Sequence, residues 1–142
     1  MKRRYRVLLA DDEQKILDTY GDFLRKRDFD VDSALDGNEA ITKLRTGDFD
    51  VAILDLLMPR MNGLEVAKVA KDEDIETSLI LLTGHGEKED AVKAVNLHLD
   101  YWVQKEEVNM EDLLAKIREL AEGVPMSKIH QLMLSVPDND KS

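Results

Sequence analysis

Carboxylates follow two short apolar runs that lie far apart in the sequence. Asp55 closes the apolar run at residues 51–54, and Asp11 and Asp12 follow the run at 7–10. Continuous apolar runs of this length are typical of strands buried on both faces of a parallel sheet. Because such sheets place ligands at the carboxyl ends of their strands, we expect the three acids to share one pocket. A pocket of this kind binds a hard cation, typically Mg²⁺, or holds a carboxylate nucleophile that accepts a phosphoryl group.

The composition limits the classes of function. A chain of 142 residues suits one domain with one core. The formal net charge of −10 argues against direct nucleic-acid binding and against binding to anionic membranes. The absence of cysteine excludes disulfides and zinc–thiolate sites. With no signal-peptide core and no apolar stretch of transmembrane length, we expect a soluble cytoplasmic protein.

The chain alternates between predicted strands and predicted helices. Strands are predicted at 7–10, 29–34, 51–54, 79–82 and 101–103. Helices are predicted at 14–27, 64–71, 87–97 and 110–122, and a further short helix is predicted to begin at Asn38, which would cap it. Five strands alternating with five helices indicate an α/β fold, with a parallel sheet covered on both faces. Right-handed crossovers place all the carboxyl ends of the strands at one edge. That edge collects five polar residues, Asp11, Asp12, Asp55, Thr83 and Lys105.

These five residues resemble the site of the receiver domain (CheY-like) of two-component response regulators. The resemblance covers about residues 5–122 and includes Pro59 and Gly63 in the loop after Asp55, and the turn at Asp36-Gly37. It implies a flavodoxin-like, doubly wound sheet with strand order 2-1-3-4-5, flanked by five helices. We therefore predict a receiver domain at 1–122. For the extension at 123–142, we predict a short amphipathic helix at about 127–136 and then a disordered tail.

The resemblance implies roles for the acids. Asp55 would be the phosphoacceptor, attacking a phosphohistidine in line to form an acyl phosphate. The three acids and the backbone carbonyl of Leu57 would hold Mg²⁺, with Asp12 ligating directly and Asp11 largely through water. The domain would then be a signalling module and not an enzyme, limited to its own phosphorylation and slow dephosphorylation.

The resemblance also implies roles for residues on the last two strands. Thr83 would donate a hydroxyl hydrogen bond to the phosphoryl group, and Lys105 would supply a compact positive charge. Trp102 stands where the family has its switch aromatic, and the small Gly84 would leave space for this ring to turn inward. The alternative is that Trp102 is a strand aromatic packed on the core.

Several neighbouring residues would adjust the site. Leu57 and His85 would flank the route of the attacking water, and the apolar Leu57 predicts slow hydrolysis. Glu106 replaces the proline that usually follows the family's lysine, so we expect the Lys105–Glu106 bond to be trans. Glu13 is interpreted as a solvated acid near the positive end of a helix.

A histidine kinase or a phosphotransfer protein would donate the phosphoryl group. A downstream protein would bind the surface formed by the predicted elements at 87–97, 101–103 and 110–122, and a homodimer is a further option. Residues 123–142 are too few for a DNA-binding output domain, which implies output through a protein partner unless the chain is a fragment of a larger regulator or hybrid kinase. Two rival hypotheses are a non-phosphorylated interaction module and a hydrolase, although Leu57 stands where a haloacid-dehalogenase-type phosphatase has its general acid.

Overall fold

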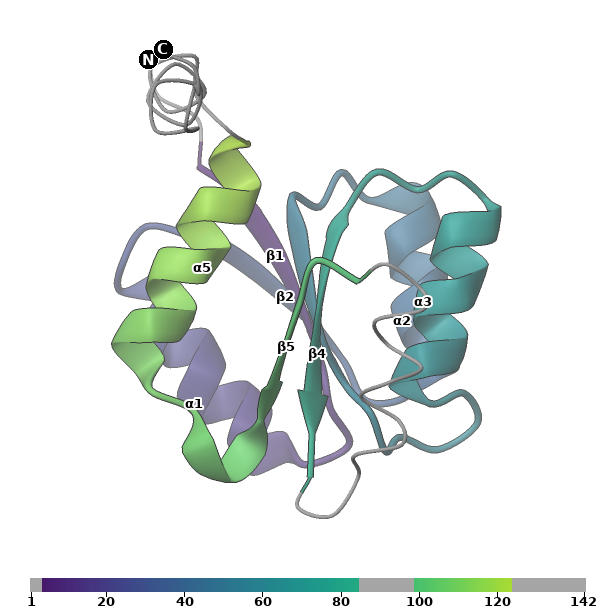
Figure 1. Ribbon diagram of the computed structural model, residues 1–142, viewed down its shortest axis with the longest axis horizontal. Helices are drawn as coiled ribbons and strands as arrows, with labels where there is room; N and C mark the ends of the chain where they lie inside the picture. The colour runs from purple at the N-terminus through teal and green to yellow at the C-terminus, as the bar shows by residue number, and fades with distance from the viewer. Residues whose placement is uncertain (1–3, 85–98, 124–142) are drawn as a thin grey trace, which may run out of the picture.

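The computed structural model describes residues 4–84 and 99–123. Its five parallel strands form one sheet in the order β2-β1-β3-β4-β5, as predicted (Figure 1). The strands are β1 (Arg6–Ala10), β2 (Asp30–Ala34), β3 (Val51–Asp55), β4 (Ser78–Thr83) and β5 (Tyr101–Gln104). Because all five run in the same direction, their carboxyl ends lie along one edge of the sheet.

Helices cover both faces of this sheet (Figure 1). α2 (Gly37–Thr46) and α3 (Gly63–Asp72) pack on one face, and α1 (Gln14–Arg25) and α5 (Met110–Glu122) pack on the other. These are the four α-helices of the described residues, and they confirm the doubly wound architecture. The fifth helix, predicted at 87–97, and the helix and tail predicted within the C-terminal extension lie outside the described residues.

The central strand β3 is buried along its whole length. Ala52 and Leu54 belong to the core cluster under α2 and α3, whereas Val51 and Ile53 belong to the cluster under α1 and α5. Alternate side chains of a strand point to opposite faces, so a strand covered on both faces must be apolar throughout. Asp55 ends this strand, so packing on both faces of the sheet holds its backbone at the sheet edge.

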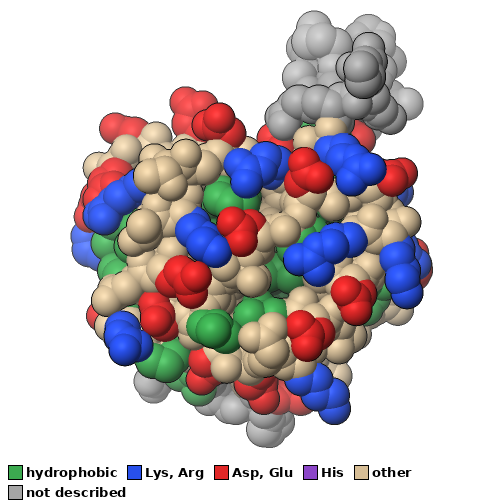
Figure 2. Space-filling model, turned by 180° about the vertical axis from the view of Figure 1, so that it is seen from behind, with side chains coloured by type: hydrophobic (Ala, Val, Ile, Leu, Met, Phe, Trp, Pro, Cys, Tyr) green, Lys and Arg blue, Asp and Glu red, His purple; other side chains and the backbone are tan. Residues whose placement is uncertain are grey.

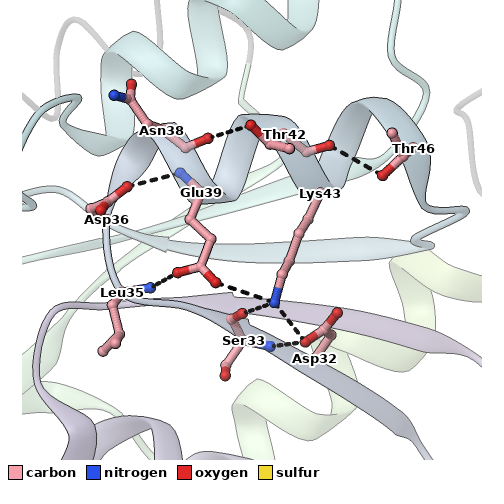
Figure 3. Close-up of polar contacts among 9 residues, drawn as sticks. All are labelled: Asp32, Ser33, Leu35, Asp36, Asn38, Glu39, Thr42, Lys43 and Thr46. Carbon is pink, nitrogen blue, oxygen red and sulfur yellow. Dashed lines mark hydrogen bonds and ion pairs between the residues drawn. The ribbon is translucent and has the colours of Figure 1, made fainter.

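The start of α2 differs from the prediction (Figure 3). We predicted Asn38 as the capping residue, but the helix begins at Gly37 and Asp36 caps it, accepting a 2.8 Å hydrogen bond from the Glu39 backbone N–H. Glu39 in turn accepts a 2.9 Å bond from the Leu35 N–H. Asn38 lies inside the first turn, where its side chain points away from this network. Aspartate and asparagine are about equally good caps, so the sequence alone did not distinguish them.

A lysine fastens the edge strand β2 to α2 (Figure 3). Lys43 Nζ lies 2.9 Å from Asp32 Oδ1 and donates a 2.6 Å hydrogen bond to the Ser33 carbonyl oxygen, both on β2. The Glu39 carboxylate lies 3.4 Å from the same ammonium. The strand is partly exposed, as predicted for an edge strand, and these contacts hold it in register beside β1.

Charged side chains of both signs are interspersed on the face seen in Figure 2, which therefore carries no extended patch of one sign. Within residues 4–84 and 99–123, no helix is long and apolar enough to cross a membrane.

Gly63→Ala tests the close approach of α3 to the end of β3. A Cβ at Gly63 would lie 2.6 Å from the Asp55 carbonyl oxygen and 2.8 Å from Leu81 Cδ1. Because β3 is packed on both faces, its backbone cannot shift without cost, and we expect Gly63→Ala to lower the free energy of unfolding by about 1–3 kcal/mol, measured by urea denaturation. In the control Gly21→Ala, the methyl would meet only the flexible end of Arg25. This control should be neutral or stabilising by roughly 0.5–1 kcal/mol, and equal losses in the two variants would contradict the argument.

Candidate functional site

The structure brings three acids together at the carboxyl edge of the sheet. Asp11 and Asp12 follow β1, and Asp55 is the last residue of β3. One carboxylate oxygen from each lies within 4.8 Å of the others. Asp11 and Asp55 are buried, whereas Asp12 is exposed. The exposed acid keeps one side of the pocket open to solvent.

Lys105 reaches into this pocket from the end of β5. Its Nζ lies 3.0 Å from Asp11 Oδ2 and 3.3 Å from Asp55 Oδ1. The residue starts a short 3-10 turn, Lys105–Glu107, directly after the strand. All peptide bonds between described neighbours are trans, including Lys105–Glu106, as predicted.

A third carboxylate on Lys105 was missed by sequence reasoning. Glu13 Oε1 lies 3.3 Å from Lys105 Nζ and accepts a hydrogen bond from it. The Glu13 side chain is 64% exposed, so it is solvated as predicted, but it is also a partner in the site. The available signal was the run of three acids, Asp11-Asp12-Glu13, at the same sheet edge as a lysine.

Burial and mutual repulsion hold the acids in an unfavourable electrostatic environment. Burial, followed by the charge of Asp11, raises the pKa of Asp55 to about 7, although Lys105 acts in the opposite direction. Burial also raises the pKa of Asp11. Burial alone would lower the pKa of Lys105, but the carboxylates of Asp11 and Asp55 outweigh it, and the pKa of the ammonium is raised.

One oxygen in the pocket is suited to a cation. Asp11 Oδ2 is fully buried and accepts no hydrogen bond from the described residues, although Lys105 Nζ lies near it. The other oxygen, Oδ1, accepts a 2.9 Å bond from the Glu13 backbone N–H. A buried carboxylate oxygen without a donor is costly, and a hard cation with oxygen ligands would satisfy it. The donor set therefore fits a divalent metal ion.

The loop after Asp55 is tied to its surroundings. The Leu56 N–H donates a 2.8 Å hydrogen bond to the Leu82 carbonyl, and Leu56 accepts a 2.9 Å bond from the Gly63 N–H. Asn62 and Glu65 form a reciprocal capping box that starts α3. These bonds fix the backbone on which the carbonyl of Leu57 stands.

The remaining predicted residues lie at different depths. Thr83 is buried at the end of β4. Leu57 is 62% exposed and Trp102 is 39% exposed, so the alternative that Trp102 is a core side chain is wrong. Gly84 directly follows Thr83, and His85 lies outside the described residues.

Comparison with known proteins identifies the family. The model of the response regulator receiver domain matches residues 7–118, and the chain belongs to this family of two-component signalling domains. A receiver domain protein described as CheY-like, from Methanospirillum hungatei JF-1, is 30% identical, with a TM-score of 0.78 over 84% of this chain and 94% of that one.

Two curated relatives are longer regulators. The transcriptional regulatory protein DltR of Streptococcus agalactiae serotype III (strain NEM316) is 30% identical over 91% of this chain and 57% of its own length. The response regulator SaeR of Staphylococcus aureus (strain USA300) is 31% identical over 87% of this chain and 53% of its own length. The chain thus spans about half the length of these relatives.

The raised pKa of Asp55 predicts a stability difference that depends on pH. In the unfolded chain this carboxyl ionises near its ordinary pKa of 3.8, and in the folded chain at about 7. Its ionisation therefore costs folding free energy that grows as pH rises between these values and levels off above the folded pKa. Asp55→Asn removes that cost, so without metal it should be at least as stable as the wild type.

The measurement is chemical denaturation of both proteins in a metal chelator. We expect the advantage of Asp55→Asn to widen by roughly 1–3 kcal/mol from about pH 5 to about pH 8, less than the full pKa shift because this window begins above the unfolded pKa of 3.8. An advantage that shrinks as pH rises would contradict this electrostatic account.

Proposed function

We propose that this receiver domain is the phosphoacceptor of a phosphorelay, with Asp55 as the acceptor. The observation that carries the proposal is the buried Asp55 at the end of β3, in one pocket with two further acids and Lys105. A carboxylate oxygen of Asp55 attacks the phosphorus of a phosphohistidine. The phosphorus–nitrogen bond breaks, and the histidine nitrogen leaves with the electron pair and takes up a proton.

The acids and the loop carbonyl are suited to hold Mg²⁺. Asp11, Asp12 and Asp55, with the backbone carbonyl of Leu57, supply the hard oxygen ligands that this ion prefers. The unsatisfied Oδ2 of Asp11 supports this assignment. When bound, the ion supplies positive charge that offsets the charge of the phosphoryl oxygens.

Lys105 and Thr83 complete the site. The Lys105 ammonium, already 3.3 Å from Asp55, stabilises negative charge on the phosphoryl oxygens. Thr83 donates its hydroxyl hydrogen bond to the same group from the end of β4. The resemblance assigns Leu57 and His85 to the route of the attacking water. An apolar, exposed Leu57 neither orients nor activates a water. The aspartyl phosphate should therefore be long-lived. Because Leu57 stands where a haloacid-dehalogenase-type phosphatase has its general acid, it also argues against the phosphatase hypothesis.

The partners follow from the role. A histidine kinase or phosphotransfer protein donates the phosphoryl group, and the surface around β5 and α5, with the segment predicted as a helix at 87–97, binds a downstream protein or a second copy. We place the receiver domain at 1–122 and an extension at 123–142, in the cytoplasm. The match covers only 57% of the length of DltR, which is named a transcriptional regulatory protein, and this supports the option that this receiver belongs to a larger regulator.

Intact-mass measurement tests the phosphoacceptor role. Incubation with Mg²⁺ and acetyl phosphate should add one phosphoryl group to the wild type. The adduct should be absent when a chelator removes the metal and absent in Asp55→Asn, which keeps the shape of the side chain but not its nucleophilic oxygen. The matched control Asp18→Asn changes an exposed aspartate of α1 and should phosphorylate normally. An adduct that persists in Asp55→Asn would assign the acceptor to another residue.

A second test addresses Trp102 as the switch residue. The ring is partly exposed in the structure. Inward rotation requires space beside Thr83, and we infer that Gly84, which has no side chain, leaves it. Beryllofluoride with Mg²⁺ mimics the phosphoryl group and should change the emission of this single tryptophan. Gly84→Val should remove most of the change by filling the space. If Gly84→Val responds as the wild type does, Trp102 does not report or make the switch.

A further inference from the structure

Glu13 has a role at the site that the metal and phosphoryl assignments leave unexplained. Its carboxylate contacts Lys105 but is not among the three acids whose oxygens converge to a possible metal site. It is therefore placed to act on the lysine and not on a cation. The following inference rests on the proposed function of Asp55 as phosphoacceptor.

The number of hydrogen-bond donors on Lys105 is limited. An ammonium carries three N–H donors and no acceptor. Lys105 Nζ already has three carboxylate neighbours, Asp11 at 3.0 Å and Asp55 and Glu13 at 3.3 Å each. Of the three, Glu13 accepts a hydrogen bond from the ammonium, so a phosphoryl oxygen that binds Lys105 competes with carboxylates that already surround it.

Exposure determines which contact is given up most easily. The side chains of Asp11 and Asp55 are 3% and 7% exposed, so little water can replace the lysine if they lose it. Glu13 is 64% exposed, and water can solvate its carboxylate as soon as the ion pair opens. Separating an exposed pair costs far less than leaving a buried charge unpaired.

The backbone of Glu13 keeps this carboxylate at the mouth of the pocket. Its N–H donates a 2.9 Å hydrogen bond to Asp11 Oδ1, and it stands at the N-cap position of α1 without a capping bond from its own side chain. The backbone of Glu13 is thus fixed by this hydrogen bond, whereas its carboxylate contacts only Lys105 among the described residues. A negative charge held there also repels an incoming phosphoryl donor.

We propose that Glu13 is a positioning residue that occupies, on Lys105, the place taken by a phosphoryl oxygen. As an internal competitor, it slows phosphorylation of Asp55 and leaves the lysine when the phosphoryl group arrives. The step breaks one ion pair and forms another, and no covalent bond to Glu13 is made.

Glu13→Gln tests the proposal, because it keeps the shape of the side chain and removes the charge. At saturating Mg²⁺, its rate of phosphorylation by acetyl phosphate should exceed the wild-type rate by about twofold to fivefold, the scale of one exposed ion pair. The control Asp18→Asn removes one charge from an exposed site on α1 and should keep the wild-type rate. Equal rates for Glu13→Gln and the wild type would overturn the proposal.

A second readout does not depend on phosphorylation. The ¹⁵N–¹H signal of the Lys105 ammonium, assigned with Lys105→Arg, should exchange faster with water in Glu13→Gln, because one partner of the N–H donors is weakened. If the wild type takes up no phosphoryl group, the proposed function fails, and the Glu13 contact is judged on this spectrum alone. Unchanged exchange in Glu13→Gln would overturn the inference.

Discussion

The candidate site depends on the balance of charge around Lys105. Two buried carboxylates, Asp11 and Asp55, lie at the end of neighbouring strands, and burial raises the pKa of each. One ammonium offsets two buried negative charges only in part, so the resting pocket opposes folding. The negative charge that Lys105 leaves uncompensated favours the binding of a further positive charge in the pocket.

Packing of the hydrophobic core offsets the unfavourable electrostatic free energy of this pocket. β1 and β3, which carry the acids, are buried under helices on both faces, and their apolar side chains cannot leave without losing the packing of both layers. The close approach of Gly63, at the start of α3, to the Asp55 carbonyl also fixes the end of β3. The acids are thus held together by contacts in which they take no part.

This division explains which features could be predicted from the sequence. Parallel strands bring their carboxyl ends together, so Asp11 and Asp55 could be placed at one sheet edge from two apolar runs alone. The cap of α2 could not, because Asp36 and Asn38 are equally good caps and periodicity does not fix a helix end to within two residues. Trp102 was ambiguous because a three-residue apolar run does not reveal that an edge strand leaves one side chain exposed. Glu13 and Lys105 are 92 residues apart in the sequence, and the acidic run at 11–13 does not by itself indicate which of its side chains contacts the lysine.

Whether a residue of this site is buried or exposed also determines whether its substitution changes folding stability or mainly reaction rates. Changing a buried acid alters both the chemistry and the folding free energy, since its charge is coupled to Lys105 and to the other acid. Glu13 and Leu57 are largely exposed, and substitutions at exposed positions usually change stability by no more than about 0.5 kcal/mol. Both residues nevertheless border the pocket in which the phosphoryl group would form. Under the proposed function, the rates of phosphorylation and dephosphorylation would vary through such exposed neighbours, while the buried acids and the lysine remain constrained by the fold.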